Sequence, residues 1–285
     1  MRQTQVSTTA QGIALARALE YTRPPEQRVC NDPLARRLMS TPFYLFGRLF
    51  ASYGERKGPG VIGFLVARCR YIDDYLLECL AAGIQQLVIL GAGLDSRAYR
   101  IEQLKQGVRV FEVDQAVTQQ AKLAKLKRIL GQLPSYVTFV AIDFNSEDLQ
   151  KLFEHGYTRQ AKTLFIWEGV VHYLTAQAVD QTLEFVHRNS APGSSIAFDY
   201  IYSSALTEAH KRGEVVRMQR ASRYTGEALA FGIEEGQAEQ FLQARGYTGI
   251  KNVSSADLKR AYFTGANQTR AVAPVYAIVH ASVPA

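Results

Sequence analysis

The stretch LVILGAGLDSRAYR, residues 87–100, decides the fold of this chain. Its first four residues form a short apolar run, which is typical of a strand buried on both faces of a parallel sheet. Gly91 and Gly93 follow at once, and a segment compatible with a helix begins near Ser96. A glycine turn after the first strand of an α/β sheet is where nucleotide-like ligands lie against bare backbone. The stretch therefore predicts a ligand site at the carboxyl edge of a parallel sheet.

Apolar strands and helical segments alternate on both sides of this stretch. Further strands are predicted at 108–114, 137–142, 163–167 and 195–200, and helices at 61–82, 96–105, 116–130, 147–154 and 176–189. After residue 202 the alternation stops. A helix at 237–245, a strand near Tyr262 and a strand at 275–283 complete the chain, with the last two strands compatible with an antiparallel hairpin at the sheet edge. The pattern predicts an α/β fold with a doubly wound seven-stranded sheet and right-handed crossovers.

The whole chain of 285 residues is interpreted as one domain with four parts. Residues 1–60 carry many turn signals between short helical pieces, among them Thr41-Pro42, and predict an N-terminal helical cover too small for its own core. Residues 61–202 form the ligand-binding core. Residues 203–235, polar and basic, are predicted to be a lid inserted after the fifth strand, and 236–285 a C-terminal helix and strands.

Composition limits the partners that the chain can have. The net charge is +7, but the basic groups are separated by acidic segments and match no nucleic-acid module, so no nucleic-acid partner is expected. The basic segment 211–223 could attract an anionic substrate. Apolar runs are far shorter than a membrane span, and the N-terminus lacks a secretory signal, so we expect no membrane partner and a cytoplasmic location. Three cysteines and scattered histidines lack ligand spacing, and no metal is expected.

Acids at strand ends suggest what the ligand is. Asp114 ends the second strand about 20 residues after the glycine turn, where a carboxylate can accept hydrogen bonds from ribose hydroxyls; Glu112, on the same face, is the alternative. Asp143 could accept from an adenine amino group while Phe144 packs on the ring. Ser96 replaces the third glycine of the dinucleotide fingerprint, a demand that a ligand without phosphates relaxes. This favours S-adenosylmethionine over a nicotinamide cofactor.

Seven pieces of the chain, spread over about residues 15–200, resemble the leucine carboxyl methyltransferase family, specifically its bacterial branch of O-methyltransferases. The pieces are RALE (17–20), NDPLA (31–35), VARCRYIDD (66–74), LGAGLDSRAYR (90–100), FEVD (111–114), IDF (142–144) and WEGVVHYL (167–174). The C-terminal third matches loosely, through FGI at 231–233 and RGY at 245–247. The resemblance implies a Rossmann-like class I methyltransferase that transfers a methyl group from S-adenosylmethionine to a carboxylate or hydroxyl oxygen. Family members methylate either a protein C-terminus or small natural products, and we expect a small-molecule substrate.

The resemblance also implies roles for residues outside the glycine turn. Arg68 matches a cofactor-binding arginine, whose guanidinium fork could clamp the carboxylate of the methionine tail, and Arg17 matches a basic contact in the helical cover. Glu168 matches a glutamate used for the cofactor and could hold the amino group of the tail. Tyr173 fits the family pattern on the substrate side. His172 stands where the family commonly has an apolar residue, and it is either a general base for a hydroxyl substrate or a loop histidine without a role.

Two other functions are compatible with the same fold. One is an NAD(P)-dependent oxidoreductase, which Ser96 disfavours. The other is a module that binds S-adenosylmethionine without turning it over. The sequence determines neither the methyl acceptor nor the oligomeric state.

Overall fold

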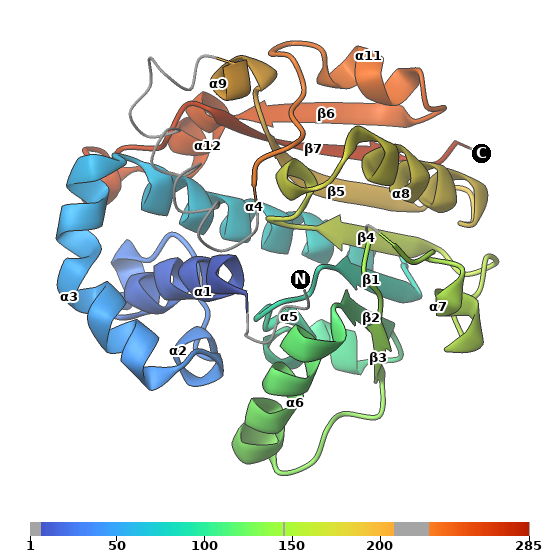
Figure 1. Cartoon of the computed structure of the whole chain (residues 1–285), viewed down its shortest axis with the longest axis horizontal. Coiled ribbons are helices and arrows are strands. Elements are labelled where there is room, and N and C mark those ends of the chain that lie inside the picture. Colours follow the sequence, from blue (N-terminus) through green and yellow to red (C-terminus); the bar gives the residue numbers. More distant parts are fainter. Residues whose placement is uncertain (1–6, 145, 208–227, 285) are drawn as a thin grey trace.

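Seven strands form one sheet in the order β3-β2-β1-β4-β5-β7-β6 (Figure 1). The computed structural model describes residues 7–144, 146–207 and 228–284. The strands are β1 (Gln86–Leu90), β2 (Arg109–Asp114), β3 (Val137–Ala141), β4 (Thr163–Trp167), β5 (Ser195–Ile201), β6 (Thr248–Ser254) and β7 (Tyr276–Ser282). Strands β1 to β5 pair in parallel, and β7 runs antiparallel to both β5 and β6. Because β1 lies between β2 and β4, the winding reverses there, which is where ligand clefts open in such sheets.

Helices cover both faces of the sheet, as the doubly wound prediction requires (Figure 1). They are α1 (Thr8–Tyr21), α2 (Ala35–Leu38), α3 (Thr41–Lys57), α4 (Val61–Ala81), α5 (Arg97–Arg100), α6 (Ala116–Leu130), α7 (Lys151–Glu154), α8 (Ala176–Arg188), α9 (Ser203–Thr207), α11 (Ala238–Gln243) and α12 (Ser255–Tyr262). Short 3-10 turns lie at Pro25–Gln27, Glu102–Lys105, Val171–Tyr173 and Gly265–Asn267.

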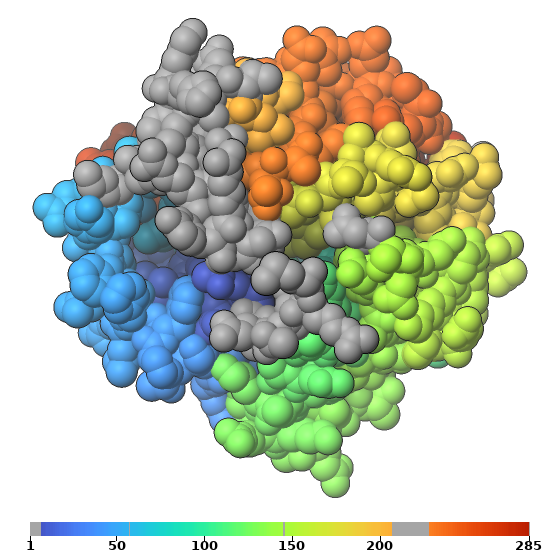
Figure 2. All heavy atoms as spheres, viewed as in Figure 1, coloured from blue at the N-terminus to red at the C-terminus, as the bar shows by residue number. Residues whose placement is uncertain are grey.

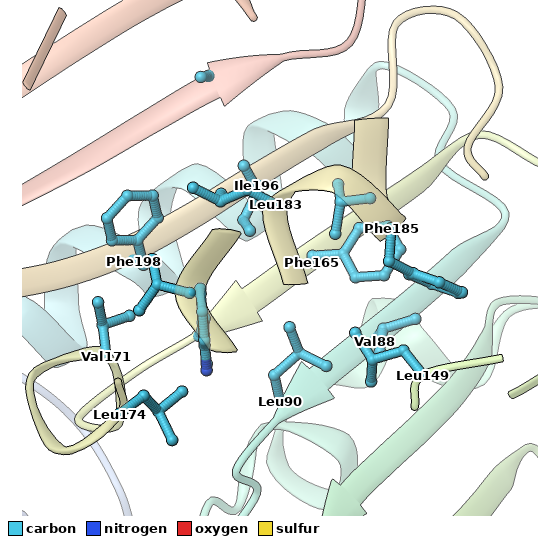
Figure 3. Close-up of a cluster of buried hydrophobic side chains, with 14 of the residues drawn as sticks. Val88, Leu90, Leu149, Phe165, Val171, Leu174, Leu183, Phe185, Ile196 and Phe198 are labelled. Carbon is cyan, nitrogen blue, oxygen red and sulfur yellow. The ribbon is translucent and has the colours of Figure 1, made fainter. Parts of the chain in front are cut away.

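Alternating strand side chains divide the core between the two faces. Val88 and Phe165 point to the side of α8, where they pack in one cluster with Leu183 (Figure 3). Leu87 belongs to the cluster on the opposite face, with Ile72 of α4. These strand residues are almost fully buried because helices cover both sides, and this is why the strands read as continuous apolar runs.

Two predicted elements were wrong. The Thr41-Pro42 turn signal instead begins α3, a helix of 17 residues, because the N–H that proline lacks would have no intrahelical partner in the first helical turn. Tyr262 ends a helix rather than lying near a strand: Ser254 and Asp257 form a capping box that starts α12. The sixth strand is β6, an edge strand in which only Val253 is buried, so its sequence shows no clear alternation.

The C-terminal strands pair antiparallel at the sheet edge, with β7 between β5 and β6. The prediction of a lid over 203–235 falls mostly on residues 208–227, including the basic segment 211–223, which lie outside the described residues. Within the described part of the chain, no helix combines the length and apolarity that crossing a bilayer requires.

Candidate functional site

A cleft opens at the carboxyl ends of β1 to β4, where α1 lies across the sheet edge. Figure 2 shows this face of the molecule, hollowed over α1. The glycine turn, the strand ends and one side of α1 line the cleft. Eight of the ten predicted site residues are among the lining residues: Arg17, Gly91, Gly93, Asp114, Asp143, Phe144, Glu168 and Tyr173. The structure therefore brings together residues that span more than half of the chain.

The glycine turn adopts a backbone conformation that other residues rarely take. Gly91 has φ +67° and Gly93 has φ +42°. A Cβ at Gly91 would lie 2.3 Å from Cγ2 of Val170, a residue that also lines the cleft. The turn needs glycine for both its geometry and its space, and it leaves backbone facing the cleft.

Asp114 is held at the cleft by the backbone around it. The Gly93 N–H donates to its Oδ2, and the Gln115 N–H donates to its Oδ1 at 2.6 Å. Its alternative, Glu112, is excluded from the cleft because it is 1% exposed and binds Lys122 Nζ at 2.7 Å. The Tyr99 hydroxyl also donates to Glu112, at 2.8 Å. The acid that can meet a ligand on β2 is therefore Asp114.

Asp143 and Phe144 form the wall of the cleft after β3. The Asp143 N–H donates to Glu147 at 2.9 Å, which fixes the backbone of this turn. The ring of Phe144 lies 6.4 Å from that of Trp167, centroid to centroid. A flat apolar side chain and an acid are thus adjacent on one wall, as the sequence predicts.

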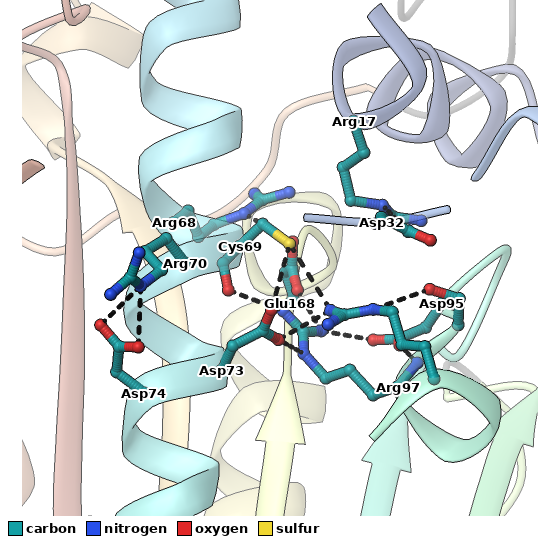
Figure 4. A network of polar contacts seen from close by, with 12 residues as sticks. Arg17, Asp32, Arg68, Cys69, Arg70, Asp73, Asp74, Asp95, Arg97 and Glu168 are labelled. Carbon is teal, nitrogen blue, oxygen red and sulfur yellow. Dashed lines mark hydrogen bonds and ion pairs between the residues drawn. The ribbon is translucent and has the colours of Figure 1, made fainter. Parts of the chain in front are cut away.

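Glu168 is held between two buried arginines (Figure 4). Its Oε1 is 3.0 Å from Nε of Arg68, and its Oε2 is 2.6 Å from Nη1 of Arg97. Burial by itself would raise the pKa of Glu168, but the two guanidinium groups outweigh it and hold the pKa below its usual value. The cleft therefore contains a carboxylate that is ionised at neutral pH.

Arg97 belongs to the charge network beside the cleft, and the sequence reasoning missed it. It is 1% exposed and donates from Nε to Asp73 at 2.7 Å, besides pairing with Asp95 and Glu168. The signal was present in the LDSR letters of the opening stretch, residues 94–97. Asp199 was missed too, although it is the one charged residue in strand β5.

Arg68 lies behind the cleft wall instead of lining it. Its Nη1 donates to Asp199 Oδ2 at 2.5 Å, and Asp199 Oδ1 accepts from the Gly169 N–H at 2.6 Å. Its Nη2 is buried and has no hydrogen-bond partner among the described residues. A Cβ built on Gly169, which does line the cleft, would lie 3.5 Å from this Nη2. One donor of Arg68 is thus unsatisfied next to the cleft.

Arg17 connects the N-terminal cover to the glycine turn. Its Nη2 donates to the Leu94 carbonyl at 2.7 Å, and its Nε lies 2.9 Å from Asp32. Both charged side chains of this pair are buried. The arginine therefore holds α1 against the segment after the glycine turn, and it also lines the cleft.

The two substrate-side residues are placed differently. Tyr173 lines the cleft, whereas His172 is not among the described residues that line it and is 5% exposed. The two rings are adjacent, with centroids 4.2 Å apart. Burial lowers the pKa of His172 from 6.5 to about 4, so its imidazole is neutral at neutral pH.

The parallel sheet, the glycine turn and the acids at the ends of β2 and β4 define a Rossmann-like protein with a site for a nucleoside-type ligand. Residues 10–187 match the family model described as leucine carboxyl methyltransferase. The chain belongs to this family, which confirms the resemblance found in the sequence.

Relatives and solved structures agree with this assignment. A "Putative S-adenosyl-L-methionine-dependent methyltransferase" of Mycobacterium avium (strain 104) is 32% identical over 267 residues, which cover 87% of this chain and 83% of that protein. The similarly named YktD of Bacillus subtilis (strain 168) is 30% identical, over 76% of this chain and 71% of that protein. A crystal structure titled as a putative methyltransferase from Thermobifida fusca YX matches with a TM-score of 0.60 and 16% identity, covering 100% of this chain and 97% of that one. The last likeness shows the fold.

Proposed function

We propose that this chain is an S-adenosylmethionine-dependent O-methyltransferase that methylates a carboxylate or hydroxyl oxygen of a small molecule. One observation carries the proposal: Asp114 and Glu168, at the ends of β2 and β4, line one cleft together with the glycine turn. Family membership and the names of the relatives support the reaction class and the cofactor. They favour methyl transfer over the NAD(P)-dependent alternative.

The cleft residues fit S-adenosylmethionine. Asp114 would accept from the ribose hydroxyls, and Asp143 with Phe144 would hold the adenine. Glu168, ionised between its two arginines, would accept from the amino group of the methionine tail. The unsatisfied Nη2 of Arg68 is a donor suited to the tail carboxylate. This buried Nη2 group supports the fit, because a buried N–H donor without a hydrogen-bond partner is costly unless a ligand satisfies it.

The bound cofactor supplies a methyl group on a positively charged sulfur, ready for in-line displacement. The chain itself contributes position: Glu168 is fixed from two sides by Arg68 and Arg97, so it needs no rearrangement to hold the tail. The glycine turn would let the ribose approach its backbone closely. Such alignment can lower the barrier by several kcal/mol.

The acceptor determines whether a proton must be removed. A carboxylate is ionised at neutral pH and needs no base, whereas a hydroxyl group does. Tyr173 lines the cleft and is the residue we assign to the substrate side. His172 is neutral and adjacent to Tyr173, but it lies outside the lining, so the site favours a carboxylate acceptor.

Calorimetric titration of the full chain with S-adenosylhomocysteine tests the cofactor site. The Asp114→Asn variant should bind about 10- to 100-fold more weakly, since hydrogen bonds to a charged group contribute about 1.5–3 kcal/mol. Asp180→Asn is the control, because Asp180 lies outside the cleft and pairs with Arg245 at the surface. Unchanged affinity in Asp114→Asn, or preferential binding of NAD, would refute the proposal.

Mass spectrometry of metabolite extracts, incubated with the protein and S-adenosylmethionine, tests the reaction. A small molecule that gains one methyl group on oxygen is the expected product. Tight cofactor binding without any methylated product would favour the alternative of a binding module without catalysis.

A further inference from the structure

Helix α3 exposes a stripe of large apolar side chains. Phe46 is 66% exposed and Leu49 is 74% exposed, and Leu45, Phe50 and Tyr53 accompany them. Five of the eight large hydrophobic side chains that are exposed among the described residues lie on this one helix. The spacing of 46, 49, 50 and 53 puts four of them on one side of a helix. A concentration of this kind marks an interaction surface.

The stripe is separate from the face by which α3 is attached to the protein. Gly47 faces α1, where a Cβ would meet Leu15 Cδ2 at 2.4 Å. Tyr44 is buried in the same core cluster as α1 residues. Figure 1 shows α3 at the periphery, beside α1 and α2. The apolar stripe is therefore on the outside of the molecule.

The charges around the stripe select the partner. Helices α2 and α3 contain five basic residues and a single acid, Glu55. That acid is engaged with its own chain, because its Oε1 accepts from the Gly60 N–H at 2.7 Å. Arg36 and Arg56 contact neutral groups: the first lies over the ring of Tyr44, and the second donates to the Ser52 carbonyl. Arg48 is exposed. Helices α2 and α3 thus carry four more basic than acidic residues.

We propose that α3 binds an anionic lipid surface, with its apolar stripe in the boundary between headgroups and acyl chains. Phenylalanine and leucine on one face and arginine beside them are the composition of helices that lie in this boundary. The arginines would reach the lipid phosphates while their stems cover apolar surface. A second copy of the chain fits less well, since it would bring the same excess of positive charge to the same face. This surface attachment differs from a membrane span and departs from the expectation of no membrane partner.

Vesicle sedimentation with the full chain tests the apolar contribution. The protein should bind vesicles of equimolar phosphatidylcholine and phosphatidylglycerol, and only weakly those of phosphatidylcholine alone. Leu49→Gln should lower the partition coefficient about tenfold, because a buried leucine contributes about 1.5 kcal/mol or more. Leu130→Gln is the matched control, a leucine exposed at the end of α6, and should bind like the unmodified chain.

The charge contribution has its own variant. Arg48→Gln with Arg56→Gln should lower binding to the anionic vesicles about fivefold per arginine, and more salt should weaken binding of the unmodified chain. Arg188→Gln on α8, exposed and away from α3, is the control and should change nothing.

Two results would overturn the inference. One is equal sedimentation of the unmodified chain and Leu49→Gln with anionic vesicles, including no binding by either. The other is a dimer in analytical ultracentrifugation that Leu49→Gln converts to monomer, which would make a second copy the occupant of the stripe.

Discussion

Replacing Arg97 by methionine should cost about 3–5 kcal/mol of unfolding free energy. Methionine keeps an apolar stem of similar length but removes the charge that faces Asp73, Asp95 and Glu168. Arg97 is 1% exposed, so water cannot replace it. Breaking a buried ion pair by removing one partner costs about 3–5 kcal/mol, because the remaining charge stays buried and unpaired. The loss is limited because Arg100 and Arg68 continue to pair with two of the three acids.

Urea unfolding, followed by circular dichroism at neutral pH, measures this cost. The control is Arg70→Met on the same helix as Asp73: Arg70 pairs with Asp74 at 2.8 Å, but the two side chains are 47% and 34% exposed. That exposed pair should contribute only about 0–1 kcal/mol. If the two variants lose the same free energy of unfolding, the buried network does not stabilise the fold, and the reasoning fails.

Two further predictions concern a buried histidine and the glycine turn. Burial lowers the pKa of His172 to about 4, so the unfolded chain binds its proton more tightly; the stability from this group is present above pH 6.5 and is lost as the pH falls, by about 2 kcal/mol between pH 7 and pH 5. Between pH 7 and pH 5, the urea midpoint should therefore fall further for the unmodified chain than for His172→Phe. Equal falls in the two proteins would contradict the lowered pKa of His172. Gly91→Ala should lose both stability and affinity for S-adenosylhomocysteine, because its Cβ meets Val170; Gly107→Ala, with φ +89° and open space, carries the backbone strain of about 1–2 kcal/mol alone. Equal losses of stability in the two alanine variants would show that contact with Val170 is unimportant.

Local sequence patterns were enough to predict the site residues that lie at strand ends. Gly91, Asp114 and Asp143 each lie at or just after the carboxyl end of a strand, and the carboxyl ends of parallel strands meet at one edge of a sheet. Their convergence on one cleft could be predicted for that reason. The position of the sixth strand could not, because an edge strand such as β6 has little buried surface to impose alternation on its residues.

Charge pairing behind the cleft was decided by the tertiary structure. Arg68 meets Glu168 and Asp199 at sequence separations of 100 and 131 residues, through the docking of α4 against β4 and β5. A sequence motif can identify a basic residue in this helix, but it cannot show whether its fork faces a ligand, an acid or both.

The sequence by itself determined the α/β winding, the glycine turn and the acids at the strand ends, since these depend on the period of apolar residues and on backbone conformation within a few residues. The tertiary structure decided that Arg97 joins three acids, that Glu112 is turned away to Lys122, and that α3 leaves its apolar stripe outside. The physical reason is that burial and pairing depend on which elements pack together over long sequence distances, and no local pattern contains that information.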